Sequence, residues 1–210
     1  MNGVSETLSG DVTLELPEFA APPEDPLRLL AEWVATARRL GVSEPLAVTL
    51  ATVDEEGSPS SRVVLLKQVE PELLFTSHHG SRKGRDLRHA PRAAATLYWR
   101  ETVQQVNLGG TVERVDDGES DRLFAERPRA AQATTVASGQ SEPLEDDAAL
   151  RREAERLAEG DDELRRPPDW GGYRFLPERI EFWHGSTDRL HRRLEYVKAG
   201  TRWSHRRLQP

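Results

Sequence analysis

Cysteine is absent from the 210 residues of the chain. Its absence excludes disulfides, thiolate nucleophiles, zinc-thiolate sites and iron–sulfur clusters. Long apolar runs are also missing, since no stretch approaches the roughly 18–20 apolar residues that span a bilayer. Residues 1–20 lack the charged and then apolar order of a signal peptide. We therefore expect a cytoplasmic protein without a membrane segment.

Several common signatures are missing as well. The sequence contains neither G-x-G-x-x-G nor G-x-x-x-x-G-K-[ST], so nothing supports a Rossmann or P-loop site. The net charge of −7 argues against a nucleic-acid binder that relies on a basic surface. His78 and His79 are adjacent at the end of a predicted strand, so their side chains point in opposite directions and no metal site is expected.

The pattern of apolar residues predicts an α+β fold that is mainly β, an antiparallel barrel with peripheral helices. Residues 1–23 are expected to form a flexible or draped arm, and residues 24–210 one domain. Asp25 and Pro26 begin a helix that Gly41 ends. Further helices are expected after Ser81 and at 118–126, 130–137 and 144–158. Strands are expected at 46–53, 60–67, 72–77, 92–99, 103–115, 172–176, 179–183, 192–197 and 202–208.

A first anion signature lies at residues 80–85, Gly-Ser-Arg-Lys-Gly-Arg. Ser81 can cap the helix that follows, whose free N–H groups and dipole favour an anion. Arg82 and Lys83 add positive charge at the same end. The alternative is a capped helix with solvated basic residues. Upstream, Arg62 and Lys67 bracket an apolar strand and fall on opposite faces unless a bulge intervenes.

A second anion signature lies near the C-terminus. Arg189, His191 and Arg193 alternate, which predicts a common face that requires a carboxylate, an anionic ligand or solvent. Trp183 would form an aromatic wall beside it. A solvated edge strand is the alternative for this triplet alone.

Amide side chains complete the candidate site. Gln105 lies early in strand 103–115, and Gln140 and Ser141 precede the helix at 144–158. Amides next to aromatic residues suit a heteroaromatic ring that donates and accepts hydrogen bonds. Combined with the two basic clusters, they point to a ligand with a phosphate tail and a flat polar ring, which is the shape of FMN.

With these motifs assembled, the chain resembles the pyridoxamine 5′-phosphate oxidase family, homodimeric proteins with an FMN-binding split β-barrel. More narrowly it resembles the phenazine-biosynthesis branch. The resemblance runs from about residue 24 to the C-terminus. It is carried by the segments 62–67, 80–83, 140–141 and 181–183, and by Gln105, Arg189, Leu190, His191 and Arg193.

The resemblance implies a role for each matching residue. FMN would be bound from one subunit by Arg62, Val63, Val64, Leu65, Leu66, Lys67, Phe75, Thr76, Ser81, Arg82, Lys83 and Gln105. Gln140, Ser141, Trp183 and Arg193 would approach from the partner subunit, which places the FMN sites at the interface of a homodimer. Arg189 and His191 would line the substrate face as helpers, since no obligatory acid or base is needed.

The substrate end departs from the vitamin oxidases, which place a Tyr, an Arg and a Ser around the substrate phosphate. Here only Arg127 remains, since the Tyr position is Leu123 and the Ser position is Ala131. The resemblance also implies a substrate contact for Lys67. Neither Leu123 nor Ala131 can donate a hydrogen bond. We therefore expect an FMN-dependent oxidase that dehydrogenates a partly reduced tricyclic phenazine precursor and passes the electrons to O2, giving H2O2. The alternatives are a pyridoxine/pyridoxamine 5′-phosphate oxidase and a non-enzymatic flavin- or haem-binding protein.

Overall fold

The computed structural model describes residues 10, 11 and 13–210, which form an eight-stranded antiparallel sheet with helices around it. The strands are β1 (Ala47–Val53), β2 (Pro59–Gln68), β3 (Leu73–His78), β4 (Arg92–Trp99), β5 (Gln104–Arg114), β6 (Trp170–His184), β7 (Arg192–Ala199) and β8 (Arg202–Leu208). The helices are η1 (Pro17–Phe19), α1 (Pro26–Arg39), α2 (Arg82–His89), α3 (Asp117–Ala125), α4 (Arg129–Ala137) and α5 (Asp147–Glu159).

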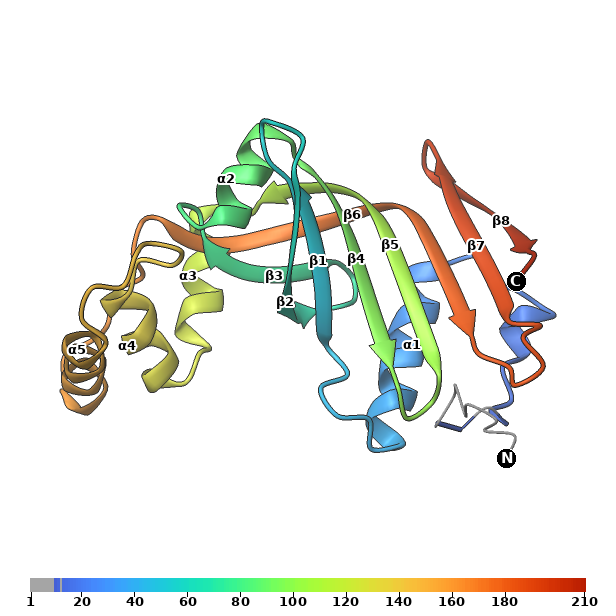
Figure 1. Cartoon of the computed structure of the whole chain (residues 1–210), viewed down its shortest axis with the longest axis horizontal. Helices are drawn as coiled ribbons and strands as arrows, with labels where there is room; N and C mark the ends of the chain where they lie inside the picture. The colour runs from blue at the N-terminus through green and yellow to red at the C-terminus, as the bar shows by residue number, and fades with distance from the viewer. Residues whose placement is uncertain (1–9, 12) are drawn as a thin grey trace, which may run out of the picture.

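The strand order is β3-β2-β1-β4-β5-β6-β7-β8, and β3 also pairs with β6. The sheet therefore curls, and β7 and β8 extend it on one side (Figure 1). The pairing between β2 and β3 is the shortest in the sheet, because only Leu66 and Gln68 of β2 pair with β3 and a bulge separates them. This confirms the predicted mainly-β split barrel, and the β2–β3 contact is where it is split.

Helix α1 covers the apolar interior of the sheet. Asp25 accepts hydrogen bonds from the backbone N–H groups of Leu27 (2.9 Å) and Arg28 (3.3 Å), so it caps the helix as expected. Trp33 of α1 is 3% exposed and packs edge-on against Phe182 of β6, with ring centroids 5.0 Å apart. The buried face of α1, which includes Leu30, Trp33, Val34 and Ala37, supplies most of the helix's stability, since intrinsic helix propensity contributes little.

Helices α3, α4 and α5 lie at the opposite end of the molecule and are stacked outward from the barrel (Figure 1). A second apolar cluster joins α3 to the sheet and contains Leu74, Val115, Leu123, Phe124 and Trp170. Helix α5 has no buried residue. It is fixed to α4 by Arg129, which donates to the carbonyl groups of Leu157 (3.0 Å) and Ala158 (2.9 Å).

Segments 172–176 and 179–183 are one strand, β6, which continues through Pro177. Within the predicted arm, Phe19 is 4% exposed and packs against Trp33, whereas residues 1–9 and 12 lie outside the described part. The extent of the arm and the single domain at 24–210 remain predictions. Across the residues that the structure describes, no helix is long and apolar enough to cross a bilayer.

Candidate functional site

A groove of about 560 Å³ lies in the split of the barrel. Residues 60–65 of β2 pair with β1 on one edge only, so their other edge is free to face this groove. Its lining comes from β2, β3, α2 and the segment after α4, namely Ser60, Ser61, Arg62, Val63, Val64, Leu65, Lys67, Thr76, Ser77, Arg82, Lys83, Gln140 and Ser141. The free strand edge offers backbone donors and acceptors, and the side chains offer positive charge.

Among the Lys and Arg residues that line the groove, Lys83 is the least exposed, at 6%. Its ammonium donates to Ser77 Oγ (2.9 Å), Ser81 Oγ (3.3 Å) and Gln140 Oε1 (3.2 Å), all of them neutral oxygens. Burial and then the nearby Arg62 guanidinium lower the pKa of Lys83 to about 8, while Asp86 acts in the opposite direction. A buried ammonium without a direct carboxylate partner is suited to a phosphate or another anion.

The start of α2 lies beside this ammonium. Ser81 accepts a hydrogen bond from the N–H of Gly84 (3.3 Å), so it caps the helix as predicted. The N–H of Arg82 donates to Ser141 Oγ (3.2 Å), which brings the segment after α4 against the helix. Gln140 and Ser141 thus lie at the same groove as Lys83 of their own chain. Their predicted approach to FMN from a partner subunit stays a prediction.

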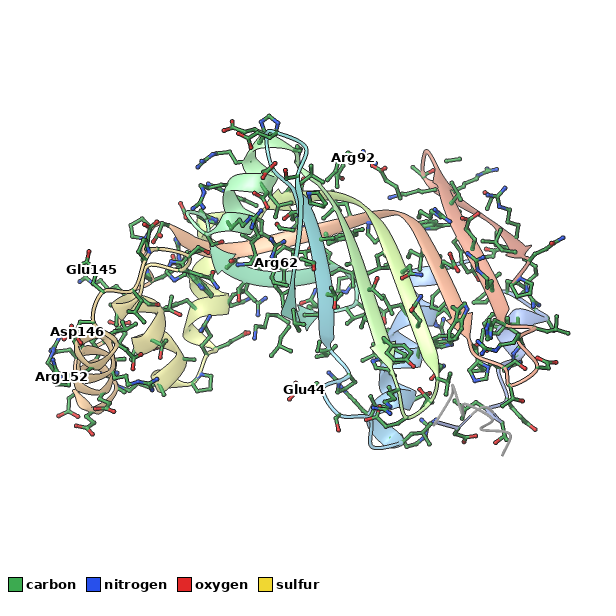
Figure 2. All side chains as sticks on the ribbon, viewed as in Figure 1. Glu44, Arg62, Arg92, Glu145, Asp146 and Arg152 are labelled. Atoms are coloured by element: carbon green, nitrogen blue, oxygen red, sulfur yellow. The ribbon has the colours of Figure 1, made fainter. Side chains whose placement is uncertain are left out.

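Arg62 is held on the other wall of the groove, in the middle of the molecule, whereas Glu145, Asp146 and Arg152 lie at its far end (Figure 2). Its NH1 donates to Thr52 Oγ1 (2.6 Å) and to the carbonyl of Leu50 (3.2 Å), and its NH2 donates to Ser60 Oγ (2.6 Å). The register shift in β2 occurs between Leu66 and Gln68. Arg62 and Lys67 both line the groove although they belong to opposite faces of β2, because residues of both faces border the groove along the free edge of this strand.

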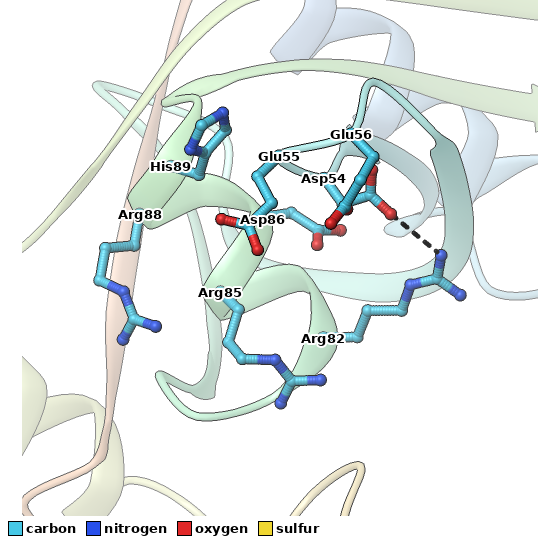
Figure 3. Close-up of a pocket in the computed structure, with 8 residues that line it drawn as sticks. All are labelled: Asp54, Glu55, Glu56, Arg82, Arg85, Asp86, Arg88 and His89. Atoms are coloured by element: carbon cyan, nitrogen blue, oxygen red, sulfur yellow. Dashed lines mark ion pairs between the residues drawn. The ribbon is translucent and has the colours of Figure 1, made fainter.

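Arg82 separates the groove from a second pocket, lined by Asp54, Glu55, Glu56, Arg82, Arg85, Asp86, Arg88 and His89 (Figure 3). The Arg82 guanidinium extends toward Asp54 of the β1–β2 turn, with 3.9 Å between NH2 and Oδ2. At that distance and 54% side-chain exposure the pair contributes little, so Arg82 remains able to turn to a ligand.

A further pair of cations marks the other end of the groove. Burial and then the nearby Arg127 guanidinium lower the pKa of Lys67. Burial also lowers the pKa of Arg127, whose guanidinium lies 4.9 Å from the Trp170 ring centroid. Arg127 NH2 donates to the Ala131 carbonyl (3.1 Å), but its buried Nε has no partner among the described residues. Two neighbouring cations favour an anion close to them.

The remaining predicted residues form a separate cluster on β5, β6 and β7. Gln105 pairs with Trp183, and Trp183 pairs with Arg193, so the three lie in one row across the sheet. The Arg193 guanidinium is fixed by Glu181, with Nε–Oε1 at 2.7 Å and NH2–Oε2 at 3.1 Å. None of these three residues lines the groove. The described chain therefore carries two separate clusters.

The turn before β7 corrects one sequence argument. Arg189, His191 and Arg193 do not alternate along one strand, because β7 begins at Arg192 and Arg189 lies in a turn with φ of 68°. Asp188 Oδ1 stabilises that turn by accepting from the N–H of Leu190 (2.8 Å). His191 still meets Trp183, with ring centroids 4.9 Å apart.

The tautomer of the neutral His191 ring follows from its backbone partner. The N–H of Ser186 donates to His191 Nδ1 at 3.0 Å. Because Nδ1 accepts, the neutral ring carries its proton on Nε2. Nε2 is then the atom that can donate to a substrate.

Three predicted site residues are core residues in this chain. Leu66 and Phe75 are 5% and 1% exposed, and Phe75 stacks on Tyr173. Leu123 is 5% exposed and belongs to the buried cluster that contains Trp170, the ring that the Arg127 guanidinium also contacts.

Sequence reasoning missed Ser60, Ser77 and Asp86. Ser60 and Ser77 line the groove, and Asp86 is buried behind it. A hydroxyl on a strand carries no distinctive signal, but Asp86 lies at the fifth position of a helix that opens with a cationic motif. A carboxylate there could have been noticed as a counter-charge. Of the adjacent histidines, His78 contacts Asp169 and His79 contacts Tyr173 Oη. Among the described residues, no group of three or more His, Asp and Glu could hold a metal ion.

Comparison with known proteins identifies the relatives. Residues 35–159 match the family Pyridoxamine 5′-phosphate oxidase, and residues 170–210 match the Pyridoxine 5′-phosphate oxidase C-terminal dimerisation region. The chain is 43% identical over 209 residues to a dihydrophenazinedicarboxylate synthase of Pseudomonas chlororaphis, covering 99% of this chain and 94% of the relative. It is 46% identical over 199 residues to a pyridoxine/pyridoxamine 5′-phosphate oxidase of Rubrobacter xylanophilus, covering 93% and 91%.

A solved structure agrees with both the sequence and the fold. The crystal structure of PhzG from Burkholderia lata 383 in complex with tetrahydrophenazine-1-carboxylic acid superposes with a TM-score of 0.93 at 42% identity. The match covers 96% of this chain and 100% of that one. Relatives with both names are similarly close, so overall identity does not separate the two activities. The chain belongs to the pyridoxamine 5′-phosphate oxidase family.

Proposed function

We propose that this protein is an FMN-dependent oxidase of phenazine biosynthesis. It dehydrogenates a partly reduced phenazine carboxylic acid, with O2 as the electron acceptor and H2O2 as the product. One observation carries the proposal. Arg62, Arg82 and Lys83 at the N-terminus of α2 form a phosphate cradle. Near it lies the Lys67–Arg127 pair, where Ala131 and the buried Leu123 supply no hydroxyl group. The dihydrophenazinedicarboxylate synthase relatives, and the PhzG complex with a tricyclic carboxylic acid, support the proposal.

The groove fits FMN in charge and in hydrogen-bonding groups. Arg62, Arg82 and Lys83 converge on the N-terminus of α2, which favours a phosphate dianion. Lys83 contacts only neutral oxygens, so a phosphate would supply its missing counter-charge. The free edge of β2 offers N–H and C=O groups to a ring with both donors and acceptors. When bound, FMN supplies the redox chemistry, taking two electrons from the substrate and passing them to O2.

The second cluster, Gln105, Trp183 and Arg193, would act on the cofactor of a partner subunit. For Gln105 this replaces the sequence-based expectation of contact within one subunit, because Gln105 lies beside Trp183 and does not line the groove. The strand pairings run from Val63 of β2 through β1, β4 and β5 to Glu181 of β6, so the second cluster shares the outward face of the sheet with Val63 and Leu65 of the groove. Val63, Leu65 and Tyr98 on that face are 64%, 45% and 52% exposed. An exposed apolar surface of this kind is typical of an interface. A homodimer packed through it would set the cradle of one subunit against Trp183 of the other.

The substrate would be positioned by charge and by ring contacts. Lys67 and Arg127 lie together without a carboxylate between them, so a substrate carboxylate would relieve their repulsion. His191 presents Nε2–H because Nδ1 is engaged by Ser186, so it can donate a hydrogen bond or exchange a proton with the substrate. Arg189 lies in the exposed turn beside it and is a second candidate for a carboxylate. Neither residue is required as an obligatory acid or base.

A second candidate is a pyridoxine/pyridoxamine 5′-phosphate oxidase, favoured by the 46% identity to the Rubrobacter xylanophilus protein. Lys67 and Arg127 would serve a substrate phosphate as well as a carboxylate. The hydroxyl groups expected beside that phosphate are missing, however. Two lost hydrogen bonds to a dianion, at about 1.5–3 kcal/mol each, predict a loss of roughly two to four decades in kcat/KM.

Anaerobic reduction of the bound flavin separates the two activities. The holoenzyme should bleach rapidly with a partly reduced phenazine carboxylic acid and slowly with pyridoxine 5′-phosphate. Ala131→Ser restores one hydroxyl group at a half-buried position and should raise the rate with the vitamin phosphate by about tenfold. Ala130→Ser, on the exposed side of the same helix, is the matched control. An equal or faster wild-type rate with pyridoxine 5′-phosphate would assign the protein to the vitamin oxidases.

A further inference from the structure

Asp86 is a carboxylate that has no evident reason to be buried. It lies on α2, on the side that faces the β1–β2 turn with Asp54, Glu55 and Glu56 (Figure 3). Its residue exposure is only 4%. A buried carboxylate is costly unless hydrogen bonds stabilise its charge. Asp86 Oδ2 accepts two, from Thr52 Oγ1 at 2.6 Å and from Ser60 Oγ at 3.1 Å.

The same two hydroxyl groups accept hydrogen bonds from Arg62. Its NH1 donates to Thr52 Oγ1 and its NH2 donates to Ser60 Oγ, each at 2.6 Å. The direct distance from Arg62 NH2 to Asp86 Oδ2 is 3.7 Å, longer than a hydrogen bond. Each hydroxyl group therefore gives its single hydrogen to Asp86 and turns a lone pair toward Arg62. The carboxylate fixes the direction of both hydroxyl groups.

This arrangement determines which donors of Arg62 stay available. A guanidinium has five N–H donors in a fixed plane. Two of them, on NH1, go to Leu50 and Thr52, and one on NH2 goes to Ser60. Within the described part of the chain, nothing accepts from Nε or from the second NH2 hydrogen. Arg62 is also a lining residue of the groove, so these two donors are the ones a phosphate can use.

We propose that Asp86 is a positioning residue for the cofactor phosphate, holding Arg62 through Thr52 and Ser60 so that its free donors face the groove. The proposal rests on the proposed function, because it takes the phosphate to be that of FMN. Asp86 does not touch the ligand in this arrangement. It acts from behind the cradle, and its position on α2 couples the strand that carries Arg62 to the helix that carries Lys83.

Asp86 also influences the charge of the cradle. Burial and then Arg62 lower the pKa of Lys83 to about 8, and Asp86 opposes that shift. Ser77, Ser81 and Gln140, the other groups that face the Lys83 ammonium, are uncharged. Removing the Asp86 charge should therefore lower the pKa of Lys83 further. The free cradle would then lose its positive charge at a lower pH.

The test compares Asp86→Asn with Glu55→Gln. Asparagine keeps the size of the side chain but removes the charge and replaces one acceptor by a donor. Glu55 is an exposed carboxylate that lines the same outer pocket, so its change is the matched control. Quenching of flavin fluorescence by the apo-protein gives Kd for FMN and for riboflavin at pH 7 to 9. Riboflavin has the same ring and lacks the phosphate.

We expect Asp86→Asn to weaken FMN about 10- to 100-fold and riboflavin less than about twofold. Its FMN Kd should also begin to rise at a lower pH than that of the wild type. Glu55→Gln should change neither ligand. If Asp86→Asn does not fold, Ser60→Ala removes one of the two bridging hydroxyl groups and should weaken FMN alone.

Two results would overturn the proposal: an equal loss for both ligands, which marks a structural role, or wild-type FMN affinity in both variants. A wild-type protein that binds FMN no better than riboflavin would overturn the assignment of the phosphate cradle itself.

Discussion

Replacement of Lys83 by methionine tests the cradle most directly. The ammonium is buried and contacts three neutral oxygens, so a bound phosphate would be its first anionic partner in direct contact. A hydrogen bond between charged groups contributes about 1.5–3 kcal/mol. Loss of one should weaken FMN by about 10- to 150-fold. Riboflavin should bind at least as well as before, because methionine removes a charge that its ring does not need.

The same ammonium predicts a pH dependence with a defined sign. In the free protein the pKa of Lys83 is about 8, so the side chain loses its charge above that pH. The phosphate of FMN has its second pKa near 6 and stays a dianion throughout. Since binding favours the charged ammonium, FMN affinity is full below pH 8 and falls above it. The Kd should rise about tenfold between pH 7 and pH 9 in the wild type and stay nearly constant in Lys83→Met.

Fluorescence titration of the apo-protein at several pH values measures both effects. Arg88→Met is the control, because Arg88 is an exposed cation on the same helix and does not line the groove. It should leave the affinity and the pH profile unchanged. A wild-type Kd that stays constant between pH 7 and pH 9 would refute this account of Lys83. So would a riboflavin loss in Lys83→Met as large as the FMN loss.

Three further predictions concern stability and assembly. Leu123→Ala should lower the free energy of unfolding by about 2–5 kcal/mol and the exposed Leu40→Ala by under about 0.5 kcal/mol, since only Leu123 leaves a cavity; equal denaturation midpoints would contradict the burial. Apo Lys83→Met should be more stable than the wild type at pH 7. The pKa of Lys83 in the folded protein lies below its unfolded value of 10.5, so the stability of the wild type rises with pH between about 8 and 10.5. The difference in Tm between Lys83→Met and the wild type should therefore narrow over this pH range, and a constant difference would contradict the lowered pKa. Mixing Arg82→Ala with Trp183→Ala subunits should restore about a quarter of the FMN sites, because half the dimers are mixed and each has one intact site; no restored binding would refute shared sites.

Local sequence signals were sufficient for most of the fold. Strand β4 has the bounds predicted for it, because its small and apolar residues alternate through Leu97 and Trp99. The strand around Pro177 was not recognised as continuous. Gly110 lies so close to the Leu176 carbonyl that a Cβ atom would be 2.1 Å from it, and the register shifts between Gly109 and Gly110. That local irregularity lets β6 continue past a residue without an N–H, and it depends on a partner strand more than 60 residues away.

In the candidate site, too, some features follow from local sequence and others depend on contacts between distant segments. The cationic motif at Arg82 and Lys83 and the cap at Ser81 are local, so the sequence was enough to predict them. The placement of Arg62 depends on the pairing of β2 with β1, and its support by Asp86 depends on the hydroxyl groups of Thr52 on β1 and Ser60 on β2. Such contacts are set by strand register and helix packing. They become visible only when the chain is folded.

The location of the two clusters on different strands would link ligand binding to assembly in the proposed homodimer. Trp183 and Arg193 lie on β6 and β7, away from the groove beside β2, so under this proposal a complete site would exist only while two subunits are associated. By thermodynamic linkage, a cofactor that prefers the dimer must also tighten it. Dilution of the protein would then weaken cofactor binding without any change in the cofactor's concentration. Cofactor supply and protein concentration would thus regulate each other through one equilibrium.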